Sequence, residues 1–158
     1  MKPCHGRAEL EARYGRLVLQ REPGGGYRIA SPIGWEAHWM VLVRDLPGLA
    51  GRRLYVNRDI AEPLRAALAA ALVACPDYAV RTIGCWNVRY KRTATGEVSM
   101  HALGLAVDIN ADTNPLGPTL VTDMPPAFVD AFRAQGFTWG GDFQGAKDAM
   151  HFQWCSNY

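Results

Sequence analysis

Two short segments of the sequence combine histidine with aspartate, and this combination can bind a metal ion. In the first segment, His101 precedes the apolar run 103–109, inside which Asp108 is the single charged residue. In the second segment, Asp148 and His151 are three positions apart. A carboxylate among apolar side chains is unfavourable unless it is paired or bound to a metal. Taken alone, Asp108 would be explained by an ion pair with an arginine, and His151 by a place in the core.

The two segments together indicate a more specific chemistry. Two imidazoles and one carboxylate can hold Zn²⁺ and leave a fourth coordination position for water. A further carboxylate close to the last ligand can then accept a proton from that water. We therefore expect His101, Asp108 and His151 to be zinc ligands and Asp148 to be the general base.

The longer stretches around these residues resemble the M15 family of zinc peptidases, which act on bacterial cell walls. The stretches concerned are SMHALGLAVDIN, GFTWGGDF and DAMHFQ. The chain matches the family's SxHxxGxAxD pattern and its closing carboxylate-x-x-His pattern at Ser99, His101, Gly104, Ala106, Asp108, Asp148 and His151. The resemblance spans about residues 80–154, and it implies the same three zinc ligands and the same base.

The resemblance also implies an arginine shortly before the first ligand. Arg89, within GCWNVR, is the best match, and Arg81 and Arg92 are the alternatives. A guanidinium at this point would stabilise the developing oxyanion or hold a substrate carbonyl, because it supplies a fixed charge and several donors. Ser99 and Trp139 are candidate substrate-binding residues, although Trp139 is equally compatible with a place in the core.

The function implied by the resemblance is that of a zinc peptidase that cleaves the stem peptide of peptidoglycan. Carboxypeptidase and dipeptidase members usually have glutamate at the base position, and Asp148 is similar to the endopeptidase members. We therefore expect cleavage of the L-Ala–D-Glu bond, by a phage endolysin-like protein or a secreted effector. A D-alanyl-D-alanine carboxypeptidase or dipeptidase is one alternative. A wall-binding module that keeps zinc without turnover is an alternative from another class.

Composition and charge exclude several other classes of protein. The chain has 158 residues, which is enough for one domain, and 49% of them are hydrophobic. Its net charge of +2 gives no basis for nucleic-acid binding, which needs a concentrated basic face. The longest apolar run covers residues 66–75, whereas a membrane span needs about 20 residues.

The N-terminal sequence contains no secretory signal, because residues 1–19 have no apolar stretch longer than 17–19. A signal needs an apolar segment of roughly 7–15 residues. We expect synthesis in the cytoplasm, followed by action on the cell wall, in the periplasm or outside the cell, after release through a holin or delivery by a secretion system. A monomer is expected, and the role of residues 1–50 is left open.

The chain has four cysteines and no CxxC pair. They are too dispersed for a zinc knuckle or a thioredoxin-like motif. We expect buried, reduced thiols, with one or two disulfides formed after export as the alternative. Three complete pairings are possible and the sequence does not choose among them. The residues are Cys4, Cys75, Cys85 and Cys155.

The elements that must position the candidate site are helices and strands in no regular alternation. Helices are expected at 59–75, capped by Asn57 or Asp59, and at about 125–135, capped by Asp123. A polar turn is expected at 91–98 and a loop at 110–122. Strands are expected at 39–43, 54–56, 80–90 and 103–109, and the last apolar segments are 137–139 and 150–154. This order predicts one α+β domain, 1–158, with a small, largely antiparallel sheet, helices packed on it and the zinc site in a cleft.

Overall fold

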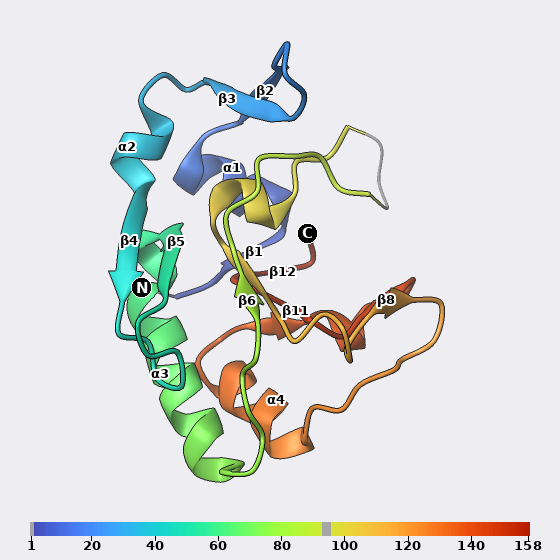
Figure 1. Ribbon diagram of the computed structural model, residues 1–158. Coiled ribbons are helices and arrows are strands. Elements are labelled where there is room, and N and C mark those ends of the chain that lie inside the picture. The colour runs from blue at the N-terminus through green and yellow to red at the C-terminus, as the bar shows by residue number, and fades with distance from the viewer. Residues whose placement is uncertain (1, 93–95) are drawn as a thin grey trace.

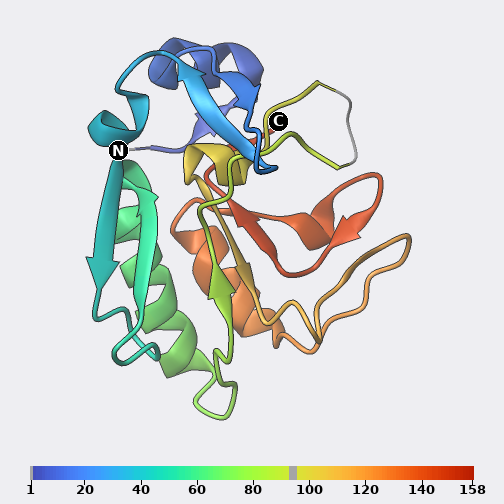
Figure 2. The same cartoon turned by 45° about the horizontal axis from the view of Figure 1, so that its top comes forward.

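A four-stranded antiparallel sheet, in the order β6-β7-β11-β9, holds two of the three residues predicted to bind the metal, Asp108 and His151. Figures 1 and 2 show the arrangement of the elements. The computed structural model describes residues 2–92 and 96–158. The four strands of the sheet are β6 (Ile83–Gly84), β7 (Ala106–Ile109), β9 (Thr138–Trp139) and β11 (His151–Gln153). Alternate residues of a strand face opposite sides. His151 and Gln153 therefore share one face of β11, and Phe152 lies on the other face.

The remaining elements surround this sheet. The helices of the described residues are α1 (Gly6–Tyr14), α2 (Trp35–Trp39), α3 (Arg58–Ala74), α4 (Pro126–Ala134) and the 3₁₀-helices η1 (Met100–Leu103) and η2 (Gly140–Asp142). The other strands pair as β1 (Cys4–His5) with β12 (Cys155–Ser156), β2 (Val18–Arg21) with β3 (Tyr27–Ser31), β4 (Met40–Arg44) with β5 (Arg53–Asn57), and β8 (Leu116–Gly117) with β10 (Lys147–Asp148). The structure confirms the expected α+β class.

The core lies between the sheet and the helices α3 and α4. Phe132 of α4 packs on the sheet, with its ring centroid 4.3 Å from that of Phe152. The longest helix, α3, lies beside α4 (Figure 1). Its apolar face is built from Leu64 and Leu68, which are fully buried. The buried side chains of the described residues form one continuous cluster from Cys4 to Cys155, so residues 1–50 share the core of the motif-bearing part.

Several expected elements are confirmed with shifted ends. The helix expected at 59–75 is α3, and its N-cap is Asn57, whose side chain accepts the backbone N–H of Asp59 at 3.1 Å. The helix expected at 125–135 is α4. The strands expected at 39–43 and 54–56 are β4 and β5, although residue 39 ends the short helix α2.

The expected strand at 80–90 is wrong, because only β6 and an isolated bridge at Tyr90 form there. The backbone of this segment supports the candidate site instead: the Cys85 carbonyl accepts a bond from the His101 ring, and the Asn87 N–H donates to the His101 carbonyl. The first part of the strand expected at 103–109 is also wrong, because Leu103 belongs to η1. Of the turn expected at 91–98, residues 93–95 lie outside the described part.

The predicted helix cap at Asp123 is wrong as well. The N-cap of α4 is Pro125, and no side chain caps it. The Asp123 carboxylate instead accepts hydrogen bonds from the Tyr78 hydroxyl at 2.8 Å and from the Asn114 amide at 2.9 Å. Hydrogen bonds within the loop therefore occupy the Asp123 side chain and keep it from capping the helix.

Gly104 allows η1 to turn directly into β7. It has a left-handed φ of +62°, and a Cβ there would lie 2.6 Å from Met40 Cε and 2.7 Å from the backbone nitrogen of Asn57. That nitrogen donates to the Gly104 carbonyl at 2.9 Å, and the Asn57 side-chain amide donates to the Leu103 carbonyl at 3.1 Å. The turn that carries His101 is therefore held against the start of α3.

Among the described residues, no helix is long and apolar enough to cross a membrane.

The substitution Gly104→Ala tests this close packing. Left-handed backbone in a non-glycine residue costs about 1–2 kcal/mol, and overpacking costs about 1–3 kcal/mol, so the free energy of unfolding should fall by about 2–5 kcal/mol. Gly51→Ala is the matched control, because Gly51 has a φ of +73° and open space around it. Urea denaturation should show a loss of only about 1–2 kcal/mol for that variant. Equal losses for both variants would mean that the crowding contributes nothing.

Candidate metal centre

Three side chains from separate parts of the chain converge at one end of the sheet. His101 Nε2 lies 3.1 Å from Asp108 Oδ1 and 3.2 Å from His151 Nδ1, and His151 Nδ1 lies 3.0 Å from the same carboxylate oxygen. Zinc ligands at about 2.0–2.1 Å from a tetrahedral ion lie roughly 3.3 Å apart. The three predicted ligands are therefore brought together at the spacing of a metal site.

The register of the sheet and the turn before β7 produce this convergence. His151 on β11 is the direct cross-strand partner of Asp108 on β7. His101 lies on η1, whose N-cap is Ser99, and the Ser99 hydroxyl accepts the His101 backbone N–H at 3.3 Å. His101 and His151 are buried, with 3% and 7% of their surface exposed.

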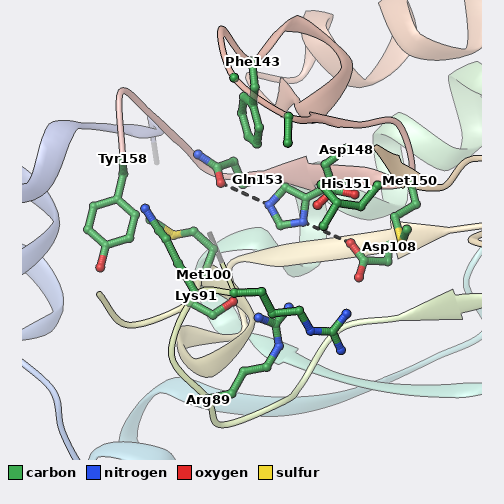
Figure 3. A pocket seen from close by; sticks show the side chains of 15 residues that line it. Arg89, Lys91, Met100, Asp108, Phe143, Asp148, Met150, His151, Gln153 and Tyr158 are labelled. Carbon is green, nitrogen blue, oxygen red and sulfur yellow. Dashed lines mark hydrogen bonds and ion pairs between the residues drawn. The ribbon is translucent and has the colours of Figure 1, made fainter. Parts of the chain in front are cut away.

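Hydrogen bonds on the outer ring nitrogens fix the orientation of both histidines. His101 Nδ1 lies 2.7 Å from the Cys85 carbonyl, which can only accept. His151 Nε2 lies 3.1 Å from Gln153 Oε1, and the Gln153 amide group donates to the Cys155 carbonyl (Figure 3). The outer nitrogens therefore carry the ring protons, and the inner nitrogens present lone pairs to each other and to Asp108. Such partners are typical of histidines that bind metals.

Three converging acceptors repel one another unless a positive charge lies between them. Burial works to raise the pKa of Asp108, but positive charge on the two neighbouring histidines, when they are protonated, outweighs burial and holds this pKa well below its usual range. Burial works to lower the pKa of His151, yet Asp108 raises it above its ordinary value. The donor set thus favours a cation, and its composition of two imidazoles and one carboxylate fits Zn²⁺.

Asp148, the predicted base, lines the pocket beside this cluster. Its Oδ1 is buried and accepts no hydrogen bond from the residues that the structure describes. Burial raises the pKa of this carboxyl, and the charge of Asp108 acts in the same direction. Its backbone is held closely, since a Cβ on Gly140 would lie 2.3 Å from the Asp148 carbonyl oxygen. Asp148 is therefore placed to accept a proton from a group inside the pocket.

Cationic side chains lie across the pocket from His151. Figure 3 shows Arg89 and Lys91 on that side, and Arg92 also lines the pocket. Burial and the charge of Arg92 lower the pKa of Arg89, whose buried Nε has no partner among the described residues. The alternative Arg81 lies elsewhere, bonded to Thr113 and near Asp112. Of the three arginines considered from the sequence, the structure brings Arg89 and Arg92 to the site.

The two candidate substrate-binding residues are placed differently. Ser99 lines the pocket, although its hydroxyl already caps η1. Trp139 is not among the lining residues: its side chain is buried, and its Nε1 donates to the Ala149 carbonyl at 2.7 Å. Gly141 lies directly over its ring. The two glycines of WGGD therefore turn the chain back over the tryptophan and fix it in the core.

The sequence did not indicate several residues of the site. The pocket has a volume of about 280 Å³, and its apolar wall includes Leu116, Phe143 and Met150. Tyr158 closes one end, where the Lys91 ammonium lies 4.0 Å from the centre of its ring. The supporting role of Gln153 could have been found from its spacing, since residues two apart on a strand share a face.

The His-Asp-His cluster beside the Asp148 carboxylate and an open pocket could hold a metal ion. Residues 92–154 match a family profile of the M15 peptidases that is described as D-alanyl-D-alanine carboxypeptidase. This match, over less than half of the chain, confirms the resemblance to M15 peptidases and leaves the subtype undecided. No solved structure matches the chain with significance.

Metal analysis of the purified protein tests the donor set. We expect one Zn²⁺ per chain, and His101→Ala should lose it because two ligands do not make a stable site. Elemental mass spectrometry after dialysis measures the content. His38→Ala is the control, because His38 lies on α2, outside the cluster. Full zinc content in His101→Ala would rule out this ligand.

The substitution Gln153→Met tests the fixed orientation of His151. Removing the partner of a ligating histidine weakens metal binding by about 10–100-fold, so the Kd for Zn²⁺ should rise by that factor. Competition with a chromophoric chelator measures it. Gln20→Met, at an exposed position on β2, is the matched control and should leave the Kd unchanged. An unchanged Kd in Gln153→Met would show that packing alone orients the ring.

Proposed function

We propose that the protein is a zinc-dependent peptidase that cleaves the stem peptide of peptidoglycan. The observation that carries the proposal is the convergence of His101, Asp108 and His151 within a pocket that also contains the unpaired carboxylate of Asp148. The match to the M15 peptidases supports a peptidase that acts on peptidoglycan.

The residues of the pocket have separable roles in this proposal. When bound, Zn²⁺ supplies a Lewis acid that polarises the scissile carbonyl. Asp148 takes a proton from the attacking water and delivers it to the leaving amine. Arg89 donates hydrogen bonds to the oxygen on which negative charge develops, and its partial burial strengthens this interaction.

The L-Ala–D-Glu bond is the proposed point of cleavage. Aspartate at position 148 is the feature shared with endopeptidase members of the family, and it is one methylene shorter than glutamate. The attacking water must then lie closer to the backbone that carries His151. The apolar wall of Leu116, Phe143 and Met150 offers contacts for the remainder of a peptide that extends past the metal.

Removal of a terminal D-alanine is the second candidate, and two observations favour it. The matched profile is described as D-alanyl-D-alanine carboxypeptidase. Arg89 and Arg92 also place positive charge in the pocket, where a terminal carboxylate could bind. The positive charge of Lys91 is offset by the Glu97 carboxylate, which lies 2.8 Å from its ammonium group.

Delivery to the cell wall is part of the proposal. A chain made in the cytoplasm would reach its substrate through a holin-dependent lysis or a secretion system. A non-catalytic wall-binding module is the alternative from another class, and the presence of Asp148 in the pocket argues against it, because binding alone does not require a base.

Asp148→Asn tests the base. The variant should retain zinc, because Asp148 is not a ligand, and should lose about 10²–10⁴-fold in kcat, the usual contribution of general-base catalysis. The release of peptide fragments from purified peptidoglycan measures the rate. Asp77→Asn is the control, since Asp77 is exposed and outside the site. A loss below about tenfold would assign the proton transfer to another group.

The products of peptidoglycan digestion show which bond of the stem peptide is cleaved. Mass spectrometry should find new D-Glu amino termini, whereas free D-Ala with intact L-Ala–D-Glu bonds would establish the second candidate.

Arg89→Ala should lower kcat more than it raises KM if its hydrogen bond strengthens in the transition state. Arg81→Ala, outside the pocket, should match the unmodified protein, and a change in KM alone for Arg89→Ala would make this residue a substrate anchor.

A further inference from the structure

Two buried cysteines face each other where the two ends of the chain meet. In the parallel pair of β1 and β12, Cys4 is the register partner of Cys155. Partners on adjacent strands project to the same side of a sheet, so both thiols lie on one face. Their exposed fractions are 1% and 0%.

The backbone spacing suits a covalent bond between them. Adjacent strands lie about 4.7–4.9 Å apart, which is within the range of about 4.4–6.8 Å between the Cα atoms of a disulfide. A hydrogen bond from the Cys155 thiol lowers the pKa of Cys4, and the charge of Arg13 adds to this effect. The positive charge of Arg13 thus favours a thiolate at Cys4.

The other two cysteines lie in different surroundings. The Cys85 thiol donates to the Gly104 carbonyl at 3.5 Å, and complete burial raises its pKa. Cys75 is the C-cap of α3. All four cysteines are buried, as expected from the sequence. The register of β1 and β12 nevertheless distinguishes Cys4 and Cys155 as one matched pair.

We propose that Cys4 and Cys155 form a disulfide when the protein meets a disulfide oxidant such as oxidised glutathione. The Cys4 thiolate attacks one sulfur of the oxidant and displaces one glutathione thiolate. Cys155 then loses its proton and attacks the mixed disulfide at Cys4, which releases the second glutathione. Two cysteine thiols are oxidised, and one glutathione disulfide is reduced to two thiols.

The position of the pair gives the oxidant a route to it. Cys4 lies near the end of the chain, next to the exposed His5, on a strand of two residues. A pair of strands of two residues each opens locally at a small free-energy cost, and such opening exposes both thiols without unfolding the four-stranded sheet. The bond would close a loop that contains nearly the whole chain, the case in which a crosslink restricts the unfolded state most.

The state of the thiols after oxidation tests the proposal directly and requires neither metal nor substrate. The protein is incubated with oxidised glutathione, or refolded in a glutathione buffer, then unfolded in an alkylating agent. We expect two of the four cysteines to escape alkylation, and peptide mass spectrometry to find Cys4 joined to Cys155. Four alkylated cysteines after both treatments, or a bond to Cys75 or Cys85, would overturn the proposal.

Thermal unfolding provides the second measurement. A loop of this length predicts that the oxidised protein has a Tm higher by roughly 10 °C than the reduced protein. Cys75→Ala is the matched control and should keep the difference between the two forms. Cys4→Ser and Cys155→Ser should each abolish it. A difference that persists in both serine variants would assign the stabilisation to another cause.

Discussion

Mutual repulsion among three electron-rich atoms is the constraint on which the site depends. The inner nitrogens of His101 and His151 and one oxygen of Asp108 lie 3.0–3.2 Å apart, and each presents lone pairs to the others. Such an arrangement persists only if the surrounding structure enforces it and a positive charge relieves it. The register of β7 and β11 enforces this arrangement, because it fixes Asp108 opposite His151.

The residues that carry chemistry were predictable from the sequence because their types are rare and their contexts are unusual. An aspartate inside an apolar run needs an explanation, and four histidines leave few possible ligands. The long amphipathic helix was predictable for a related reason: the apolar residues of α3 recur on one face, and its cap is local. The helix inference uses interactions between residues close in the sequence, whereas the site inference joins two separate segments, since His151 lies 43 positions after Asp108.

The rest of the site depends on contacts between distant residues. The stretch 80–90 has the composition of a strand, yet the Cys85 carbonyl and the Asn87 N–H form hydrogen bonds with His101. From its type and spacing, Trp139 could lie either in the core or in the cleft. Only the path of the chain over its ring places it in the core. The pairing of Cys4 with Cys155 rests on two strands of two residues each, too short to leave a pattern in the sequence.

Asn57 shows how the first half of the chain participates in the site. Its side chain caps α3 and holds the Leu103 carbonyl, while its backbone N–H holds that of Gly104. The turn that positions His101 is thus anchored on residues far upstream of the family match, which begins at residue 92. A transplant of the matched segment into another scaffold would carry all three metal-binding side chains but not the support of the first one. The segment that can be recognised from its motif is therefore shorter than the segment needed to position the three side chains.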